Sequence, residues 1–424
     1  MQASRLDPPS LPLGLRRLAG SFESGLLRAL SRWSNVLIVI AAMVAVSMAF
    51  GLHGLLTPLR TDYVAMLTGA QVLGHGGCLY CVGAQARAQA VLLGVAPATH
   101  PALDPFLETP IVALAYRPLL GLAPSAGFAV FLALSAVCVV AAAVLVWRRL
   151  GLAAQGPAGA ALLALTLISL PAAWNYQLGQ VDGLLVLALV GGAVLLTAPR
   201  RVAAGLVLSA LLLKPQTVWL VPLALLLIGE WRVVAGMAIG GVCLAGASVW
   251  LVGTAGIGQW LTLLAGRGPA LSTSDGIPGA IASLGGNGAG FVAAAVLGVV
   301  ACGWLWWRRR SFTSRPLDVL ALGVACSLLF APHVYGYDLI MVTVPLAVLA
   351  RRALPAALAA ALLLNATYLV DTYFIWEGPH LEALALCVIV ALLAVHLTDR
   401  SPAERSPGAG RAQTAAASST TTGA

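Results

Sequence analysis

The chain has 424 residues, of which 60% are hydrophobic and 9% are charged, and its mean hydropathy is +0.94. A soluble core cannot bury so much apolar surface, so the composition excludes a soluble domain and predicts an all-α polytopic membrane protein. The formal net charge of +9 does not indicate a nucleic-acid partner, because the basic residues lie in short clusters between apolar runs, where they act as topology signals.

The N-terminal segment, residues 1–34, carries arginines among regularly spaced leucines. This pattern is typical of an amphipathic helix that lies on the inner membrane surface. Residues 36–56 are apolar and long enough to span the bilayer. A cleaved signal peptide is disfavoured, because the region before this apolar run is far longer than the basic start of a normal leader.

Residues 57–122 form a long loop that we expect on the extracytoplasmic side. It carries Asp62, the first carboxylate after the first span. A carboxylate at the bilayer surface is costly unless it is used or paired, so Asp62 is either a working group or the partner of Arg60. Residues 63–73 and 111–122 have apolar runs too short to span comfortably, which predicts surface-lying or re-entrant helices.

Two consecutive apolar runs, 203–213 and 217–228, are each about half the length that a transmembrane helix needs. Between them lies Lys214-Pro215-Gln216, which contains the single lysine of the chain. Basic residues flank the pair on both sides, so both ends should be cytoplasmic and the tip should stop inside the membrane. A cation and non-helical backbone at that depth are tolerated only where they line a cavity.

The complete pattern predicts about twelve transmembrane or re-entrant segments in a membrane domain of residues 35–397. Both termini should be cytoplasmic, because the arginine clusters at 148, 200, 308 and 351 then all fall on the cytoplasmic side. Residues 398–424 are rich in Ser, Thr, Pro and Gly and are predicted to be a disordered tail. The apolar segments outside the first span and the short pair are 123–146, 158–173, 183–197, 233–252, 289–307, 317–330, 339–349, 353–370 and 381–397.

Polar residues gather at the outer ends of these segments. They are Asp62, Arg117, Asn175, Gln177, Gln180, Asp182, Lys214, Gln216, His333, Tyr337 and Asp338. A carboxylate, a lysine, a histidine and amides around a cavity open to lipid fit the transfer of a sugar from a lipid phosphate. Asp62 would take the proton of the acceptor hydroxyl, and Lys214, His333 or Arg117 would neutralise the departing phosphate.

Four blocks of residues resemble the polytopic GT-C glycosyltransferases, and within them glycosyltransferase family 87. Asp62-Tyr63 with Gly76-Gly77-Cys78-Leu79-Tyr80 is similar to the Asp-aromatic opening and Gly-Gly-x-x-Tyr close of that family. Gly179-Gln180-Val181-Asp182 resembles its Gly-Gln-x-Asn block, Leu213-Lys214-Pro215-Gln216 its Lys-Pro-Gln block, and Pro332-His333 with Tyr337-Asp338 its Pro-His motif. The blocks occur in family order from residue 62 to residue 338.

The resemblance implies an inverting, metal-independent and cofactor-free transfer with Asp62 as catalytic base and Lys214 and His333 near the donor phosphate. It implies a polyprenyl-phosphate sugar donor, with mannose as the first expectation and arabinofuranose as the alternative, and a lipid-linked or glycan acceptor. Tyr63, Tyr80, Asn175, Gln180, Asp182, Gln216, Tyr337 and Asp338 are the expected substrate-binding residues. Two departures stand out: Glu108-Thr109-Pro110 replaces Tyr-Pro-Pro, and Asp182 adds a carboxylate that competes with Asp62 as base.

Other interpretations remain open at this point. A broken helix with lysine at the break is also how transporters hold anionic substrates, although no pair of similar halves and no inward-facing polar group favours a carrier here. Lys214 has the alternative role of a helix-end anchor, and Asp338 that of a helix cap. Tyr337 and Trp260 fit the aromatic belt of the membrane interface, and Cys78 and Cys81 are compatible with a local disulfide or with two free thiols.

Overall fold

The computed structural model describes residues 13–96, 104–267, 271–374 and 381–398. Within these residues the chain forms α-helices and short 3-10 helices and no strand, which confirms the all-α prediction. The predicted disordered tail lies outside them, apart from Thr398, as do residues 1–12 of the predicted N-terminal segment.

Six helices are long and apolar enough to cross a membrane, or up to seven if the bent pair α6 (Gly156–Leu167) and α7 (Leu170–Leu178) forms one span. The chain is therefore a multi-pass membrane protein. Four other apolar helices have only 10–17 residues, fewer than a full crossing needs. The six long helices are α1 (Leu13–Leu56), α5 (Pro124–Arg149), α11 (Trp231–Arg267), α12 (Ile277–Phe312), α14 (Thr343–Phe374) with the 3-10 helix η8 (Gly336–Val342) before it, and α15 (Leu381–Thr398).

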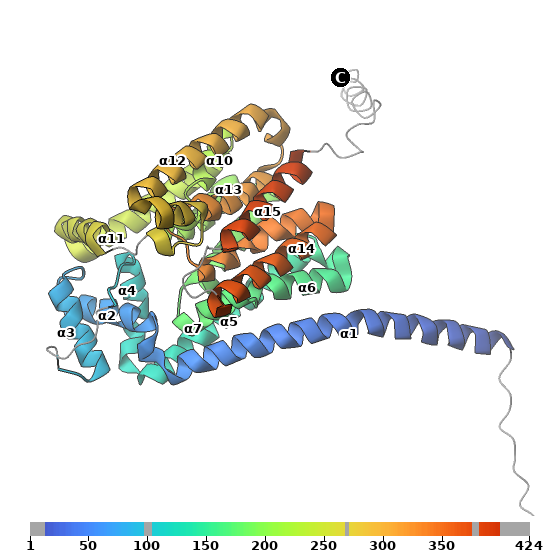
Figure 1. The fold of residues 1–424 in the computed structure, drawn as a ribbon, viewed down its shortest axis with the longest axis horizontal. Coiled ribbons are helices and arrows are strands. Elements are labelled where there is room, and N and C mark those ends of the chain that lie inside the picture. The colour runs from blue at the N-terminus through green and yellow to red at the C-terminus, as the bar shows by residue number, and fades with distance from the viewer. Residues whose placement is uncertain (1–12, 97–103, 268–270, 375–380, 399–424) are drawn as a thin grey trace, which may run out of the picture.

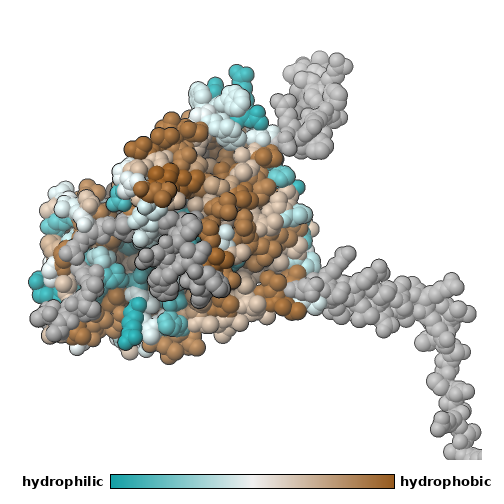
Figure 2. Space-filling model, in the orientation of Figure 1, coloured by the Kyte–Doolittle hydropathy of each residue, from teal (hydrophilic) through white to brown (hydrophobic). Residues whose placement is uncertain are grey.

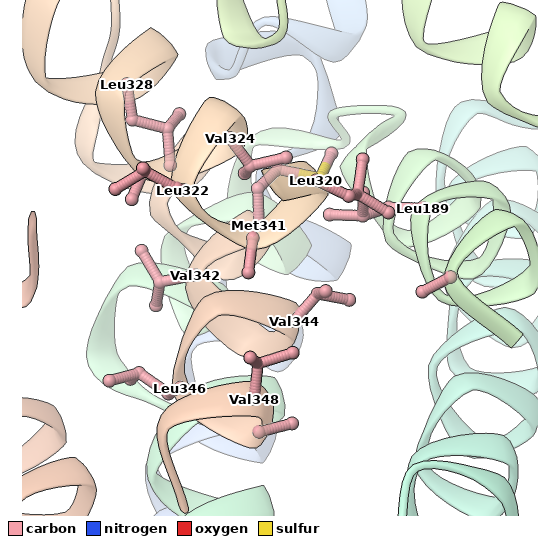
Figure 3. Packing of buried hydrophobic residues seen from close by; sticks show 14 of the residues in the cluster. Leu189, Leu320, Leu322, Val324, Leu328, Met341, Val342, Val344, Leu346 and Val348 are labelled. Atoms are coloured by element: carbon pink, nitrogen blue, oxygen red, sulfur yellow. The ribbon is translucent and has the colours of Figure 1, made fainter. Parts of the chain in front are cut away.

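The core of the bundle is formed by α13 (Pro316–Phe330), every residue of which is buried. A helix that is apolar on all sides lies at the centre of a protein, surrounded by other helices. Figure 3 shows its leucines and valines packed against Met341, Val344 and Val348 from η8 and α14 and against Leu189 from α8 (Asp182–Leu196). Figure 2 shows apolar side chains over much of the flank of the bundle, as expected for a surface that faces lipid.

Three of the long helices contain a sharp bend, at Gly253 in α11, Gly286 in α12 and Ala353 in α14. The sequence predicted that the apolar segment ends at residue 252, but α11 continues past the bend to Arg267. Trp260 in this part donates from Nε1 to the carbonyl of Leu107 at 2.7 Å. This contact ties the end of α11 to the loop of residues 57–122.

The first outer loop folds into a small helical cap beside the bundle (Figure 1). Its helices are α2 (Tyr63–Gly74), α3 (Val82–Leu93) and α4 (Pro110–Tyr116), with the 3-10 helices η1 (Pro58–Arg60) and η3 (Arg117–Gly121) at their ends. The sequence pattern predicted α2 and α4 but not α3. Gln85 of α3 donates to Leu79 at 2.8 Å and accepts from the Phe106 amide at 2.9 Å, and a Cys78–Cys81 disulfide lies just before α3.

The two short apolar runs form the predicted broken hairpin. The first is α9 (Arg201–Leu208) continued by η5 (Ser209–Leu213), and the second is η6 (Pro215–Thr217) followed by α10 (Val221–Leu227). Arg201 Nε and Glu230 Oε2 lie 3.2 Å apart, so the two ends of the hairpin meet. Lys214, at the break, is thereby carried away from both ends into the bundle.

Candidate active site

Lys214 lies at the break of the hairpin with its ammonium group buried, and its side chain is 2% exposed. Nζ is 2.8 Å from Oδ2 of Asp182 and 3.1 Å from Oδ1 of Asp338. The Tyr337 ring covers it, with 4.6 Å from Nζ to the ring centroid. Lys214 is therefore not a helix-end anchor at the interface, and Tyr337 packs on this cation inside the protein.

Asp182, the departure from the family block, is the first residue of α8 and is fully buried. Its Oδ2 accepts from Lys214 and also from Nδ2 of Asn175 at 2.8 Å. A buried carboxylate needs such partners. Asp182 therefore serves as a counter-ion of Lys214.

Asp62 directly precedes α2, makes no capping hydrogen bond with its side chain, and is half-buried. Its Oδ2 accepts from Nε2 of Gln180 at 2.5 Å, and no ion pair with Arg60 is present in the described part of the chain. Burial raises the pKa of Asp62 above the ordinary value of 3.8, while the Gln180 hydrogen bond and the positive charge of Lys214 oppose the rise. Such a carboxylate is a stronger base than an exposed aspartate.

The Gly-Gln-Val-Asp turn joins these two parts of the site. Gly179 ends α7 with φ +75, and a Cβ there would lie 3.0 Å from the Phe128 ring and 3.1 Å from Cβ of Tyr63, so the position requires glycine. Tyr116 donates to the Gly179 carbonyl at 2.8 Å. The turn thus presents Gln180 to Asp62 on one side and Asp182 to Lys214 on the other.

Glu108 belongs to the same site, although sequence reasoning did not select it. Burial raises the pKa of its carboxyl group, Lys214 opposes the rise, and Asp338 and Asp62 add to it by repulsion. Tyr80 donates to the Glu108 carbonyl at 2.8 Å and stacks on Phe106, which fixes the loop that carries Glu108. The signal in the sequence was the departure from Tyr-Pro-Pro at this position.

The stretch after α13 carries His333 and Asp338. Asp338 accepts from the Tyr335 amide at 2.9 Å through Oδ2 while Oδ1 contacts Lys214, so it caps η8 and pairs with the lysine. His333 lies edge-on to Tyr335 with 4.5 Å between ring centroids, and its buried Nδ1 has no hydrogen-bond partner in the described residues. Burial lowers the pKa of His333, and the charge of Asp338 opposes this, so the ring is neutral at pH 7.

Four predicted site residues are not brought to these carboxylates. Arg117 is exposed, and its Nε lies 3.5 Å from the position of a Cβ on Gly74, at the far end of α2 from Asp62. Twelve residues of helix separate these ends by about 18 Å. Tyr63 is fully buried among Tyr116, Phe128 and Phe131. Tyr80 stabilises the loop that carries Glu108. Gln216 is half-buried, and its side chain forms no hydrogen bond in the described residues.

The charge of this site is unusual. One ammonium group, that of Lys214, lies among the four carboxyl groups of Asp62, Glu108, Asp182 and Asp338. When carboxyl groups lie this close together, their repulsion favours protonation of those whose negative charge is least stabilised by hydrogen bonds or cations. Asp62 has both a hydrogen-bond donor and the lysine to compensate it, whereas no hydrogen bond or ion pair to the Glu108 carboxyl group is present among the described residues. Glu108 is therefore the less compensated of these two carboxyl groups, and protonation is more favoured there than at Asp62.

Comparison with known proteins assigns the chain to a family. The model of glycosyltransferase family 87 matches residues 106–332, more than half of the chain. The matched region includes Gln180, Asp182 and Lys214, whereas Asp62 lies well before its start and His333 directly follows its end. No curated protein and no solved structure matches the chain. The chain has a multi-pass helical fold and a carboxylate that is suited to act as a base. Together with this match, these features show that the chain belongs to glycosyltransferase family 87.

Proposed function

We propose that the protein transfers a sugar, mannose as the first candidate and arabinofuranose as the second, from a polyprenyl-phosphate donor to a hydroxyl group of a lipid-linked or glycan acceptor. The fold would be of the GT-C type, and the reaction would take place at the extracytoplasmic face of the cell membrane without a metal or cofactor. The observation that carries the proposal is the half-buried Asp62, hydrogen-bonded through Gln180 to the turn that also holds Lys214 in a family 87 chain.

Asp62 acts as general base in this proposal. Gln180 holds Oδ2 and leaves Oδ1 to accept the proton of the acceptor hydroxyl. The acceptor oxygen then bonds to the anomeric carbon as the bond from that carbon to the phosphate oxygen breaks, with inversion. The electron pair leaves with the lipid phosphate, and the proton remains on Asp62.

The leaving phosphate gains negative charge in the transition state and needs a donor near it. His333 is suited to this role because its Nδ1 is buried and unpartnered and a phosphate anion would favour its protonated form. Lys214 has three N–H donors, of which two go to Asp182 and Asp338. Its third donor and its charge support phosphate binding, and the protonated Glu108 avoids repulsion of the donor.

An apolar cavity of about 270 Å³ offers a place for the polyprenyl chain. It lies between α10, α12, α13 and α15, and its lining includes Leu220, Ala301, Cys326 and Phe330. Leu220 lies within the hairpin, six residues after Lys214, and Phe330 lies three residues before His333. A lipid tail in this cavity would therefore bring its phosphate end toward both proposed phosphate-binding residues.

The experiment is a transfer assay with the purified full chain, a panel of polyprenyl-phosphate sugars and acceptor lipids, read by mass spectrometry. We expect one sugar to be transferred and Asp62→Asn to lower the rate by about 10²–10⁴-fold, with an unchanged thermal unfolding temperature. Arg87→Gln, at an exposed position of the same outer loop, is the control and should keep full activity. Full activity of Asp62→Asn would remove Asp62 as base, and substrate counterflow into liposomes without transfer would favour a transporter.

A further inference from the structure

We infer that Asp275, Asp371 and Glu382 form a binding site for a hard divalent cation, with Ca²⁺ the best match, away from the transfer site. One carboxylate oxygen from each residue lies within 4.8 Å of the others. Two oxygens on opposite sides of a Ca²⁺ ion at a ligand distance of about 2.4 Å are about 4.8 Å apart. Three carboxylate oxygens within this distance of one another can all reach one ion.

The burial of Glu382 points to a ligand in this cluster. Its side chain is 1% exposed, and its buried Oε2 has no hydrogen-bond partner among the described residues. Oδ1 of Asp371 is buried in the same way. The two carboxyl groups contact each other through a side-chain hydrogen bond, and neither residue forms an ion pair with a basic side chain in the part of the chain that the structure describes. A buried carboxylate oxygen beside two further carboxylates needs a cation or a proton.

Three outer segments meet at this cluster. Asp275 follows the 3-10 helix η7 (Leu271–Thr273) between α11 and α12, Asp371 lies in the last turn of α14, and Glu382 is in the first turn of α15. All three are outer ends in the predicted topology. Carboxylate oxygens are the ligands that hard cations prefer, and extracellular Ca²⁺ sites bind in the range of about 10⁻⁴–10⁻³ M.

The cation would also act on the proposed transfer site through the backbone. The Asp275 amide donates to the Val334 carbonyl at 2.8 Å, and the Val334 amide donates to Oγ of Ser274 at 2.9 Å. Val334 is the neighbour of His333. An ion that fixes Asp275 to α14 and α15 therefore fixes the segment that carries His333. This structural role differs from the metal-independent chemistry expected at Asp62.

The test uses the full chain in detergent, freed of metal with EDTA, without sugar donor or acceptor. Ca²⁺, Mg²⁺ and Mn²⁺ are added separately, and bound metal per chain and the thermal unfolding temperature are measured. We expect one Ca²⁺ per chain and a rise of the unfolding temperature, since ligand at a hundred times Kd favours the folded state about a hundredfold. Hydrogen exchange of a peptide that contains Val334 should slow when Ca²⁺ is added.

The variants are Glu382→Gln and Asp371→Asn, with Asp104→Asn as the exposed control. Both cluster variants should lose the bound ion and the stabilisation, while the control keeps them. In metal-free buffer Glu382→Gln should be at least as stable as the native chain, because the repulsion between carboxylates is reduced, and this shows that the variant folds. The inference is overturned if the native chain binds no stoichiometric ion, or if Glu382→Gln responds to Ca²⁺ like the native chain. Neither result depends on sugar transfer.

Discussion

Asp62 is held between opposing influences on its pKa: burial raises it, and the Gln180 hydrogen bond and Lys214 lower it. A general base works only when it is ionised. The transfer rate should therefore be full above the raised pKa of Asp62 and should fall as the pH drops through it, at a higher pH than for an ordinary aspartate. A pH profile of kcat/KM measures this acid limb. A limb at the ordinary aspartate pKa would contradict the burial of the base.

Two substitutions should affect this limb differently. Gln180→Leu removes a hydrogen bond to the charged form of Asp62, which raises its pKa, so the limb should move to higher pH. Glu108→Gln replaces a carboxyl group that is protonated in the proposed site, so the charge near Asp62 is unchanged and the limb should stay where it is in the native chain. Profiles of both variants are compared with that of His333→Asn. If only His333→Asn moved the limb, the titrating group would be His333 and not Asp62.

At the level of single residues, the sequence predicted those that interrupt an apolar pattern. Asp62 and Lys214 stand out because a charge beside or inside an apolar run is costly. Glu108 lies in a polar loop where a glutamate is ordinary, so only the departure from Tyr-Pro-Pro marked it, and the fold was needed to bring it near Lys214. Arg117 was selected for its charge alone, and the helix α2 separates it from Asp62. The partners of Asp182 lie in other segments of the chain, so they could not be predicted from the sequence around Asp182 alone.

The broken hairpin is the element on which the ion cluster depends. Lys214→Met would leave Asp182 and Asp338 buried without their cation, and loss of one partner of a buried pair costs about 3–5 kcal/mol. We expect a large fall of the thermal unfolding temperature, and a partial recovery when Asp182→Asn is added to Lys214→Met. Asp182→Asn alone should be nearly neutral, since the amide oxygen still accepts from Lys214 and the Asp338 pair remains. An unfolding temperature of Lys214→Met equal to that of the native chain would show that Lys214 is not buried in this cluster.

The cavity between α10, α12, α13 and α15 leads to a second prediction at this scale. Ala301→Phe should fill part of it, and Ala295→Phe on an exposed face of the same helix is the control. Loss of contact with two CH₂ groups, at about 0.8 kcal/mol each, corresponds to about a tenfold higher KM. The KM for a long-chain polyprenyl donor should rise only in Ala301→Phe, and that for a short-chain donor in neither variant. Equal KM values for the long donor would place the lipid elsewhere.

Elements with a strong apolar period were predictable, and elements fixed by tertiary contacts were not. Residues 203–228 showed their break because each run is too short to cross. Helix α3 has few large apolar residues and is held by hydrogen bonds of Gln85, which no periodicity records. The second half of α11 follows a bend at Gly253, and glycine-rich sequence there resembled a loop. Its Trp260 contact with Leu107 explains why it is ordered.

At the scale of the whole molecule, contacts between distant segments fix the ends of the bundle. Asp318 pairs with Arg315 and Arg352, both at 2.7 Å, and Arg352 also donates to the His396 carbonyl at 2.9 Å. This network joins the ends of α13 and α15 to the bend of α14. In the cluster of Asp275, Asp371 and Glu382, the last two residues lie at the other ends of α14 and α15 from that network, and Asp275 precedes α12. The sequence predicted the apolar segments, but only the fold brings residues tens of positions apart into these two clusters.

The last prediction concerns the side of the membrane on which the site lies. Arginine clusters are retained in the cytoplasm, so Thr313, which follows such a cluster, should lie inside the cell. His75, which directly follows α2, should lie outside. In a chain with its free cysteines replaced, His75→Cys should react with a membrane-impermeant maleimide on intact cells, and Thr313→Cys only after the membrane is opened. Both positions are exposed, so access and not burial decides the labelling. The reverse pattern would turn Asp62 toward the cytoplasm, and a base on that side could not serve a donor whose sugar is presented at the outer face.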